Sequence, residues 1–242
     1  IVIGPVPPYK GGLSHFNDSM INELRKKNDV KIISWKRQYP KIIYPIDPIA
    51  PEDKYIINKN KDFLLDFYNP FSWFKASRII NDFNPDLVIF TWLSPIVSPV
   101  YYSIVYFMKK NIKNLCICHN VLQHEGTFLD DFLRKIFFSK INNFIVHSSK
   151  DFEDSLKINK KSNTILSFHP AYDMFKTSKK FDNNYKNTIL FFGYIREYKG
   201  LIYLIRAMPK VLKELNIKLL IVGEFWENKN IISKYLTKFL TG

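Results

Sequence analysis

The sequence predicts an α/β fold, in which a parallel sheet is covered by helices on both faces. Short apolar runs alternate along the chain with longer segments whose apolar residues recur at helical spacing. The first run, IVIG at residues 1–4, continues through a loop of prolines and glycines into such a segment at residues 13–24. Because parallel strands need a crossover connection, usually a helix, this alternation is typical of a parallel α/β sheet.

The apolar runs locate the strands, and the segments between them locate the helices. Predicted strands lie at residues 1–4, 30–35, 86–90, 114–118, 143–147, 164–166, 188–192 and 218–223. Predicted helices lie at residues 13–24, 70–83, 95–110, 128–139 and 201–215. Ser148 and Asp151 predict a capping box that begins a further helix. Residues 38–69 are irregular and contain several prolines, so no element is predicted there.

A polar, charged interval at residues 172–187 divides this pattern into two domains. Residues 1–170 form the predicted N-terminal domain, and residues 171–242 begin the predicted C-terminal domain. The second part holds one strand–helix–strand unit and an amphipathic tail, and one such unit cannot close a hydrophobic core. We therefore expect the C-terminal domain to be incomplete here, and the start, which lies inside a strand without Met, to be truncated as well.

The charge of the chain bears on its partners. The chain has 36 Lys and Arg residues against 22 Asp and Glu residues, a formal net charge of +14 that favours anionic partners. The basic residues are scattered, so a solvated lysine-rich surface explains much of this charge equally well. No nucleic-acid recognition motif is present, and we expect no specific nucleic acid as a partner.

The lengths of the apolar stretches and the two cysteines indicate in which cellular compartment the protein works. The longest apolar stretch, residues 95–108, is shorter than the about 20 residues that a bilayer span needs. Cys116 and Cys118 lie one residue apart in a predicted strand, which supports neither a disulfide framework nor structural zinc. We expect a cytoplasmic protein. Its basic, aromatic-rich N-terminal half would suit peripheral docking to an anionic surface, the inner face of the cell membrane.

Candidate functional residues follow the strands, because ligands of open parallel sheets bind beyond the carboxyl ends of the strands. Gly11 and Gly12 precede a helix whose N-terminus favours an anion, although an ordinary turn explains them as well. His119 directly follows a strand and would donate to a sugar hydroxyl or an oxyanion, unless the backbone satisfies it. His147 has a similar position but a weaker case, since Ser148 beside it is predicted to cap a helix.

The loop Gly193–Gly200 carries the sharpest pair of candidates, Arg196 and Lys199. Two cations and the N-terminus of the following helix suit a diphosphate, and the alternative is a solvated basic turn. A diphosphate that leaves in a group transfer develops negative charge, and stabilising this charge accelerates the reaction. Gly223 and Glu224, after the last predicted strand, complete the predicted donor- and phosphate-binding set.

Several familiar signatures are missing from the sequence. No Gly-x-Gly-x-x-Gly follows a strand, which weighs against a dinucleotide oxidoreductase, and no P-loop is present. No Gly-x-Ser-x-Gly elbow supports a serine hydrolase. His124 and Glu125 lack the helical histidine spacing of a zinc site, so no metal site is predicted.

Five segments carry a resemblance to a known family. They are GPVPPYKGGLSHF (4–16), CHNVLQHE (118–125), FIVHSS (144–149), HPAYD (169–173) and ILFFGYIREYKGLIYLIRAMP (189–209). In this order they resemble the retaining glycosyltransferases of family 4, which have the GT-B architecture. The resemblance extends over nearly the whole chain, and the loop after residue 192 is its most specific part.

The resemblance implies two Rossmann-like domains whose parallel sheets face a cleft, with the acceptor on the N-terminal side and the donor nucleotide on the C-terminal side. It implies a hexosyltransferase of polysaccharide biosynthesis. Such an enzyme moves a sugar from a nucleotide-diphosphate sugar to a saccharide or lipid-linked acceptor, with retention of configuration and without a cofactor or metal. Gly12 would lie near the donor phosphate. The predicted catalytic residues are His119, at the transferred sugar, and Arg196 and Lys199, at the departing diphosphate.

The sequence departs from the family pattern at two places. The position after the first glycine of the loop, where many members have arginine, is Tyr194. A downstream pair of glutamates that binds the donor in the family has no counterpart, and the last glutamate is Glu227. A non-catalytic nucleotide- or carbohydrate-binding α/β module, or an inactive fragment, therefore remains the alternative.

Overall fold

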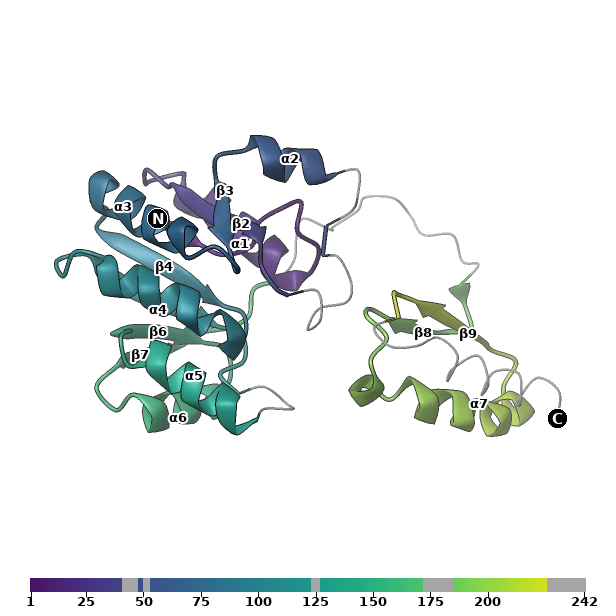
Figure 1. Cartoon of the computed structure of the whole chain (residues 1–242). Coiled ribbons are helices and arrows are strands. Elements are labelled where there is room, and N and C mark those ends of the chain that lie inside the picture. Colours follow the sequence, from purple (N-terminus) through teal and green to yellow (C-terminus); the bar gives the residue numbers. More distant parts are fainter. Residues whose placement is uncertain (41–47, 50–52, 123–126, 172–184, 226–242) are drawn as a thin grey trace. The chain divides into compact units, whose positions relative to one another are not determined.

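The computed structural model describes residues 1–40, 48–49, 53–122, 127–171 and 185–225 of the 242-residue chain (Figure 1). The chain divides into two compact units, Ile1–Lys176 and Thr177–Gly242, and each has its own sheet. The boundary predicted after residue 170 precedes this division. The acceptor and donor roles assigned to the two domains stay predictions.

The first unit is built on a seven-stranded sheet in which every neighbouring pair is parallel. Its strands are β1 (Val2–Ile3), β2 (Ile32–Arg37), β3 (Phe63–Asp66), β4 (Leu87–Trp92), β5 (Lys113–Cys118), β6 (Asn143–Val146) and β7 (Asn163–Leu166). Their order is β3-β2-β1-β4-β5-β6-β7, so the direction of the chain through the sheet reverses at β1. This arrangement confirms the predicted Rossmann-like α/β fold.

Helices connect these strands. They are α1 (Gly12–Leu24), α2 (Lys54–Lys59), α3 (Pro70–Phe83), α4 (Ser98–Phe107), α5 (Phe128–Phe138) and α6 (Ser149–Ile158), and the short 3-10 helix η2 (Pro95–Val97) precedes α4. Right-handed crossovers place α1 on one face of the sheet and α3 to α6 on the other, and α3, α4 and α5 lie side by side (Figure 1). In the part of the chain that the structure describes, no helix has the length and apolar character that crossing a bilayer requires.

Two elements, α2 and β3, lie in the segment for which the sequence predicted none. Strand β3 is at the edge of the sheet and pairs with β2 through an irregular register. Phe67 N donates to Arg37 O at 2.9 Å, and the Arg37 guanidinium makes two hydrogen bonds to the Asp66 carboxylate, at 2.9 and 2.7 Å. Pairing with β2 across the sheet therefore holds this short strand, and a local sequence pattern does not show such pairing.

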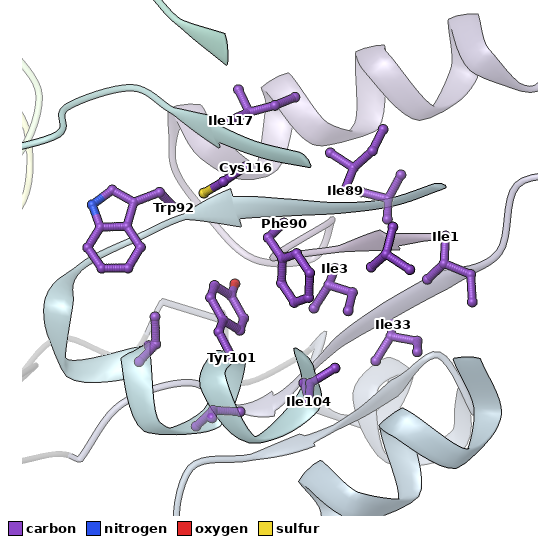
Figure 2. Close-up of a cluster of buried hydrophobic side chains, with 14 of the residues drawn as sticks. Ile1, Ile3, Ile33, Ile89, Phe90, Trp92, Tyr101, Ile104, Cys116 and Ile117 are labelled. Carbon is purple, nitrogen blue, oxygen red and sulfur yellow. The ribbon is translucent and has the colours of Figure 1, made fainter. Parts of the chain in front are cut away.

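The core of the first unit includes a group of aromatic side chains that lies between β4 and the helices α4 and α5. Phe90 is fully buried and lies beside Tyr101 of α4 (Figure 2), with ring centroids 5.3 Å apart. Its ring centroid also lies 5.6 Å from that of Phe137 on α5. Trp92 stacks on Phe137 with ring centroids 5.7 Å apart. This packing fixes the carboxyl end of β4 against the helical layer.

The two cysteines belong to the same core. Cys116 and Cys118 are fully buried, and their sulfur atoms lie 3.7 Å apart on one face of β5. Both are free thiols, which confirms the prediction that they do not pair. Burial raises the pKa of Cys118 well above its usual range, so this thiol stays protonated and acts as an apolar side chain.

The second unit consists, in its described part, of two parallel strands and one long helix. β8 (Thr188–Phe192) pairs with β9 (Lys218–Val222), and α7 (Leu201–Glu214) connects them after the 3-10 turn η5 (Glu197–Lys199). A small core of Ile195, Leu201 and Ile205 joins α7 to the sheet. This confirms the predicted strand–helix–strand unit, whereas the predicted amphipathic tail lies outside the described residues.

A buried amide holds the loop between β1 and α1 in place. Asn17 is fully buried; its Nδ2 donates to Pro5 O at 2.7 Å, and its Oδ1 accepts from Thr91 Oγ1 at 2.7 Å. A Cβ on Gly4 would lie 2.6 Å from Asn17 Nδ2 and 2.8 Å from Thr91 Oγ1, so only glycine fits there. Asn17 thus ties the start of α1 to both β1 and β4.

Replacing Asn17 with Ala is expected to lower the free energy of unfolding by about 2 kcal/mol, because a buried carbonyl and a buried hydroxyl lose their partner. Urea unfolding measures the change. The matched control is Asn22→Ala on the exposed side of the same helix, which is expected to shift stability by less than about 0.5 kcal/mol. Equal effects of the two variants would show that the buried amide does not hold this loop.

Candidate functional site

The predicted site residues form two groups, one in each unit, and both lie at the carboxyl ends of strands. Gly11, Gly12 and His119 belong to the first unit. The second unit contains the loop Gly193–Gly200, with Arg196 and Lys199, and the turn Gly223–Glu224 after β9.

The N-terminus of α1 lies after β1, the strand at which the order of the sheet reverses. Such a switch point is where open α/β sheets bind ligands. Gly11 is the N-cap with a φ of 111°, it has no side chain that could cap the helix, and a Cβ at Gly11 would meet no atom within 4 Å. The dipole of the 13-residue helix favours an anion at this end.

Three histidines from three consecutive strand ends form a cluster beside this helix. His119 follows β5, His147 follows β6 and His169 lies shortly after β7. The ring centroids of His119 and His147 are 4.9 Å apart, and His169 lies 5.1 and 5.3 Å from them, respectively. Phe16 of α1 packs its ring edge-on against His119, with centroids 4.5 Å apart, so the cluster also contacts the helix that begins at Gly12.

The cluster is electrically neutral at its centre. Burial, together with the neighbouring rings of His147 and His169, lowers the pKa of His119 to about 3. Burial also lowers the pKa of His147. Three imidazoles at this separation repel one another when protonated, so at neutral pH the buried members offer hydrogen-bonding nitrogens without charge.

A buried carboxylate fixes the turn that carries His119. Asp151 Oδ1 accepts from Val121 N at 2.6 Å, and Oδ2 accepts from Ser148 Oγ at 2.6 Å. Ser148 Oγ in turn accepts from Asp151 N at 3.1 Å, which confirms it as the cap of α6. The cap by Ser148 is therefore confirmed, but the second half of the predicted capping box, a hydrogen bond from the Ser148 backbone to the Asp151 side chain, is wrong. Asp151 is directed to the turn after β5 instead of the backbone of its own helix start, because Val121 N needs an acceptor in the buried interior.

In the second unit, two glycines let the loops after β8 and β9 meet. A Cβ on Gly223 would lie 1.8 Å from Gly193 O, which excludes every other residue at this position. Gly193 N donates to Val222 O at 3.0 Å, and Ile195 N donates to Glu224 O at 2.8 Å. The two loops therefore continue the parallel pair beyond the strands.

Lys199 bends back over the end of β8. Its Nζ lies 3.1 Å from the position that a Cβ of Gly193 would take. Gly200 permits this reversal, because it has a φ of 71° and forms the N-cap of α7 without a side-chain cap. The ammonium nitrogen therefore lies next to the end of β8, on the residue that precedes the N-cap of α7.

Arg196 and Glu224 complete this end of the second unit. The Arg196 guanidinium carbon lies 5.2 Å from the ring centroid of Tyr198, a cation–π distance. Glu224 is exposed, and burial of Tyr194 together with this nearby carboxylate raises the pKa of Tyr194. The structure thus gathers the predicted residues of the second unit, while their roles toward a donor stay predictions.

No group of three or more His, Cys, Asp or Glu side chains in the described residues is arranged to hold a metal ion. His124 and Glu125 lie outside the described residues, as do Tyr172 and Asp173 of the last resembling segment before β8. The expectation of a metal-independent reaction stays a prediction.

From the sequence alone, His119 is a predicted site residue, His147 has a weaker case, and His169 belongs only to the resembling segment HPAYD. A usable signal was present, because each of the three histidines follows the end of a strand and the three strands are consecutive. Adjacent parallel strands present such positions at one edge, so equivalent placement predicts proximity.

Replacing His119 with Gln is expected to flatten the pH dependence of stability below pH 6.5. The unfolded His119 ring takes up a proton near pH 6.5, whereas the folded ring stays neutral down to about pH 3. Stability is therefore complete above pH 6.5 and falls as the pH decreases, by up to about 1.4 kcal/mol per unit for one proton. Urea unfolding between pH 4 and 7 tests this, with His15→Gln as control; equal slopes for parent and His119→Gln contradict it.

Comparisons with known proteins support the fold. No family model and no curated protein matches the chain. Among solved structures, the chain is similar to the UDP-GlcNAc 2-epimerase from Methanocaldococcus jannaschii, with a TM-score of 0.59 and 12% sequence identity. The match covers 99% of this chain and 68% of the epimerase chain. The similarity agrees with the predicted α/β fold with a Rossmann-like parallel sheet, whereas the GT-B arrangement of two domains and membership of glycosyltransferase family 4 stay predictions.

Proposed function

We propose that this chain belongs to an enzyme that transfers a sugar from a nucleotide-diphosphate sugar to a saccharide or lipid-linked acceptor, with retention of configuration. The observation that carries the proposal is the position of Lys199. Its ammonium group lies against Gly193 at the carboxyl end of β8 and at the start of α7. A diphosphate bound there would meet a cation and a helix N-terminus at once.

In such a transfer, the bond between the sugar and the diphosphate breaks, and negative charge develops on the departing diphosphate. Lys199 and Arg196 would stabilise this charge more in the transition state than in the bound donor, which lowers the barrier. Gly193 and Gly223 let the backbone approach the phosphates closely. These cations would do what a divalent metal does in other transferases.

The first unit would contribute the groups around the sugar. Gly11 and Gly12 begin a helix whose N-terminus suits a phosphate of the donor, and His119 would contact the transferred sugar.

A second candidate is a reaction of a nucleotide sugar without an acceptor. The fold similarity to an enzyme named as a UDP-GlcNAc 2-epimerase favours it. A non-catalytic nucleotide- or carbohydrate-binding module is the third. Incubation with nucleotide sugars separates the three, since transfer requires an acceptor, epimerisation yields an isomer of the donor, and a binding module leaves the donor unchanged.

Replacing Lys199 with Ala is expected to weaken binding of a nucleoside diphosphate by more than about 1 kcal/mol, roughly a factor of five or more, because a charge-assisted hydrogen bond is lost. Calorimetry with UDP, GDP, ADP and dTDP measures the effect. Lys213→Ala, in the last turn of the same helix, is the control and is expected to leave affinity unchanged. Equal affinities of Lys199→Ala and the parent, or no binding of any of the four, would contradict the proposal.

We also propose that the acceptor is presented at an anionic membrane surface. Support comes from exposed aromatic side chains on α3 and α4: the Phe107 ring lies 5.4 Å from that of Phe74 and 5.1 Å from that of Tyr106. Lys109 and Lys110 follow after Met108. Aromatic rings flanked by lysines suit the interface of a bilayer that carries negative lipids.

Replacing Tyr106 and Phe107 with Ser is expected to reduce cosedimentation with phosphatidylglycerol vesicles at low salt at least threefold. Phe128→Ser is the matched control, because Phe128 is more exposed than either residue but lies on α5. Unaltered sedimentation of the parent protein with acidic vesicles would contradict membrane docking, and equal loss in the control would contradict this surface.

A further inference from the structure

The proton on the His147 ring can be assigned from its surroundings. Nδ1 of His147 lies 3.3 Å from the backbone oxygen of Ser167, and a carbonyl oxygen only accepts hydrogen bonds. Nδ1 must therefore donate and carry the proton. Since burial keeps the ring neutral, the other nitrogen, Nε2, presents a lone pair.

This lone pair has no partner in the described part of the protein. Nε2 of His147 is buried and makes no hydrogen bond to a described residue, and the same holds for Nε2 of His119. A buried polar atom without a partner costs about 1–3 kcal/mol, so native proteins seldom retain one without a reason. Two of them lie here on rings 4.9 Å apart, at the ends of neighbouring strands.

The chemistry of the cluster selects the kind of ligand. Neutral imidazoles do not attract a phosphate, and the described residues contain no group arranged for a metal. The cluster combines hydrogen-bonding nitrogens with the apolar ring of Phe16, which lies 4.5 Å from His119 and 5.8 Å from His147. A saccharide presents hydroxyl groups beside C–H faces and is the class of molecule that matches both features.

We propose that His119, His147 and Phe16 form a saccharide-binding site in which His147 Nε2 accepts a hydrogen bond from a sugar hydroxyl. The exposed ring of His169 lies 5.1 Å from that of His119 and 5.3 Å from that of His147. His169 would move aside when the sugar enters. Ser167 is the positioning group, because its carbonyl fixes which nitrogen of His147 carries the proton. The inference rests on the proposed function, since the saccharide is the one that a nucleotide sugar carries.

Two substitutions at His147 separate its two nitrogens. In His147→Asn, the amide nitrogen replaces Nδ1 and nothing replaces Nε2, whereas in His147→Gln an amide oxygen can reach the position of Nε2 and accept. We expect His147→Asn to weaken binding of nucleotide sugars at least tenfold and His147→Gln to stay within threefold of the parent. The probes are UDP-glucose, UDP-N-acetylglucosamine and GDP-mannose, each compared with UDP or GDP by calorimetry, with His15→Asn as control.

Affinity for UDP or GDP alone is expected to stay unchanged in both His147 variants. Nitrogen NMR of the parent protein gives a second measurement. The His147 ring should carry its proton on Nδ1, and the Nε2 signal should shift with a nucleotide sugar but not with UDP or GDP. A proton on Nε2 of His147, or equal binding of nucleotide sugars by His147→Asn and the parent, overturns the inference. In that case, binding of UDP or GDP would still support the diphosphate site. If none of UDP, GDP, ADP and dTDP binds, the proposed function itself fails.

Discussion

The first unit depends on the buried amide of Asn17. This side chain joins Pro5, Thr91 and α1 at the point where the order of the sheet reverses. Its hydrogen bonds are made out of contact with water, so losing one of them leaves a buried polar group without a partner. Because the same helix carries Gly12 at its start and Phe16 one turn later, the amide that fixes α1 also fixes the helix N-terminus and one wall of the histidine cluster.

The two units offer opposite electrostatic environments at their strand ends. In the first unit, burial lowers the pKa values of His119 and His147, so both rings are neutral at neutral pH, and the apolar ring of Phe16 packs against His119. In the second unit, Lys199 and Arg196 lie on a loop next to a helix N-terminus. A nucleotide sugar has a neutral sugar at one end of a charged diphosphate. The proposed function assigns each part of this molecule to the environment that suits it.

Glycine makes the second environment possible through backbone geometry. The loops after β8 and β9 touch at Gly193 and Gly223, where a side chain at residue 223 would overlap a carbonyl oxygen. Gly200 adopts a left-handed conformation that turns the chain into α7 and leaves Lys199 facing back to the strand end.

The sequence by itself determined the alternating strands and helices, because local hydrophobic period and capping residues decide these elements. The helix at residues 70–83 and the strand at residues 188–192 have the predicted bounds. Sequence also placed Gly12, His119 and Lys199 after strands, and the position of a residue after a parallel strand is enough to predict its edge of the sheet. Only the tertiary structure decided three other features. Strand β3 depends on pairing with β2, and Asp151 is directed to Val121 because a distant backbone amide needed an acceptor. The contact of His147 and His169 with His119 depends on β5, β6 and β7 being neighbours in the sheet, and local sequence patterns do not encode this strand order.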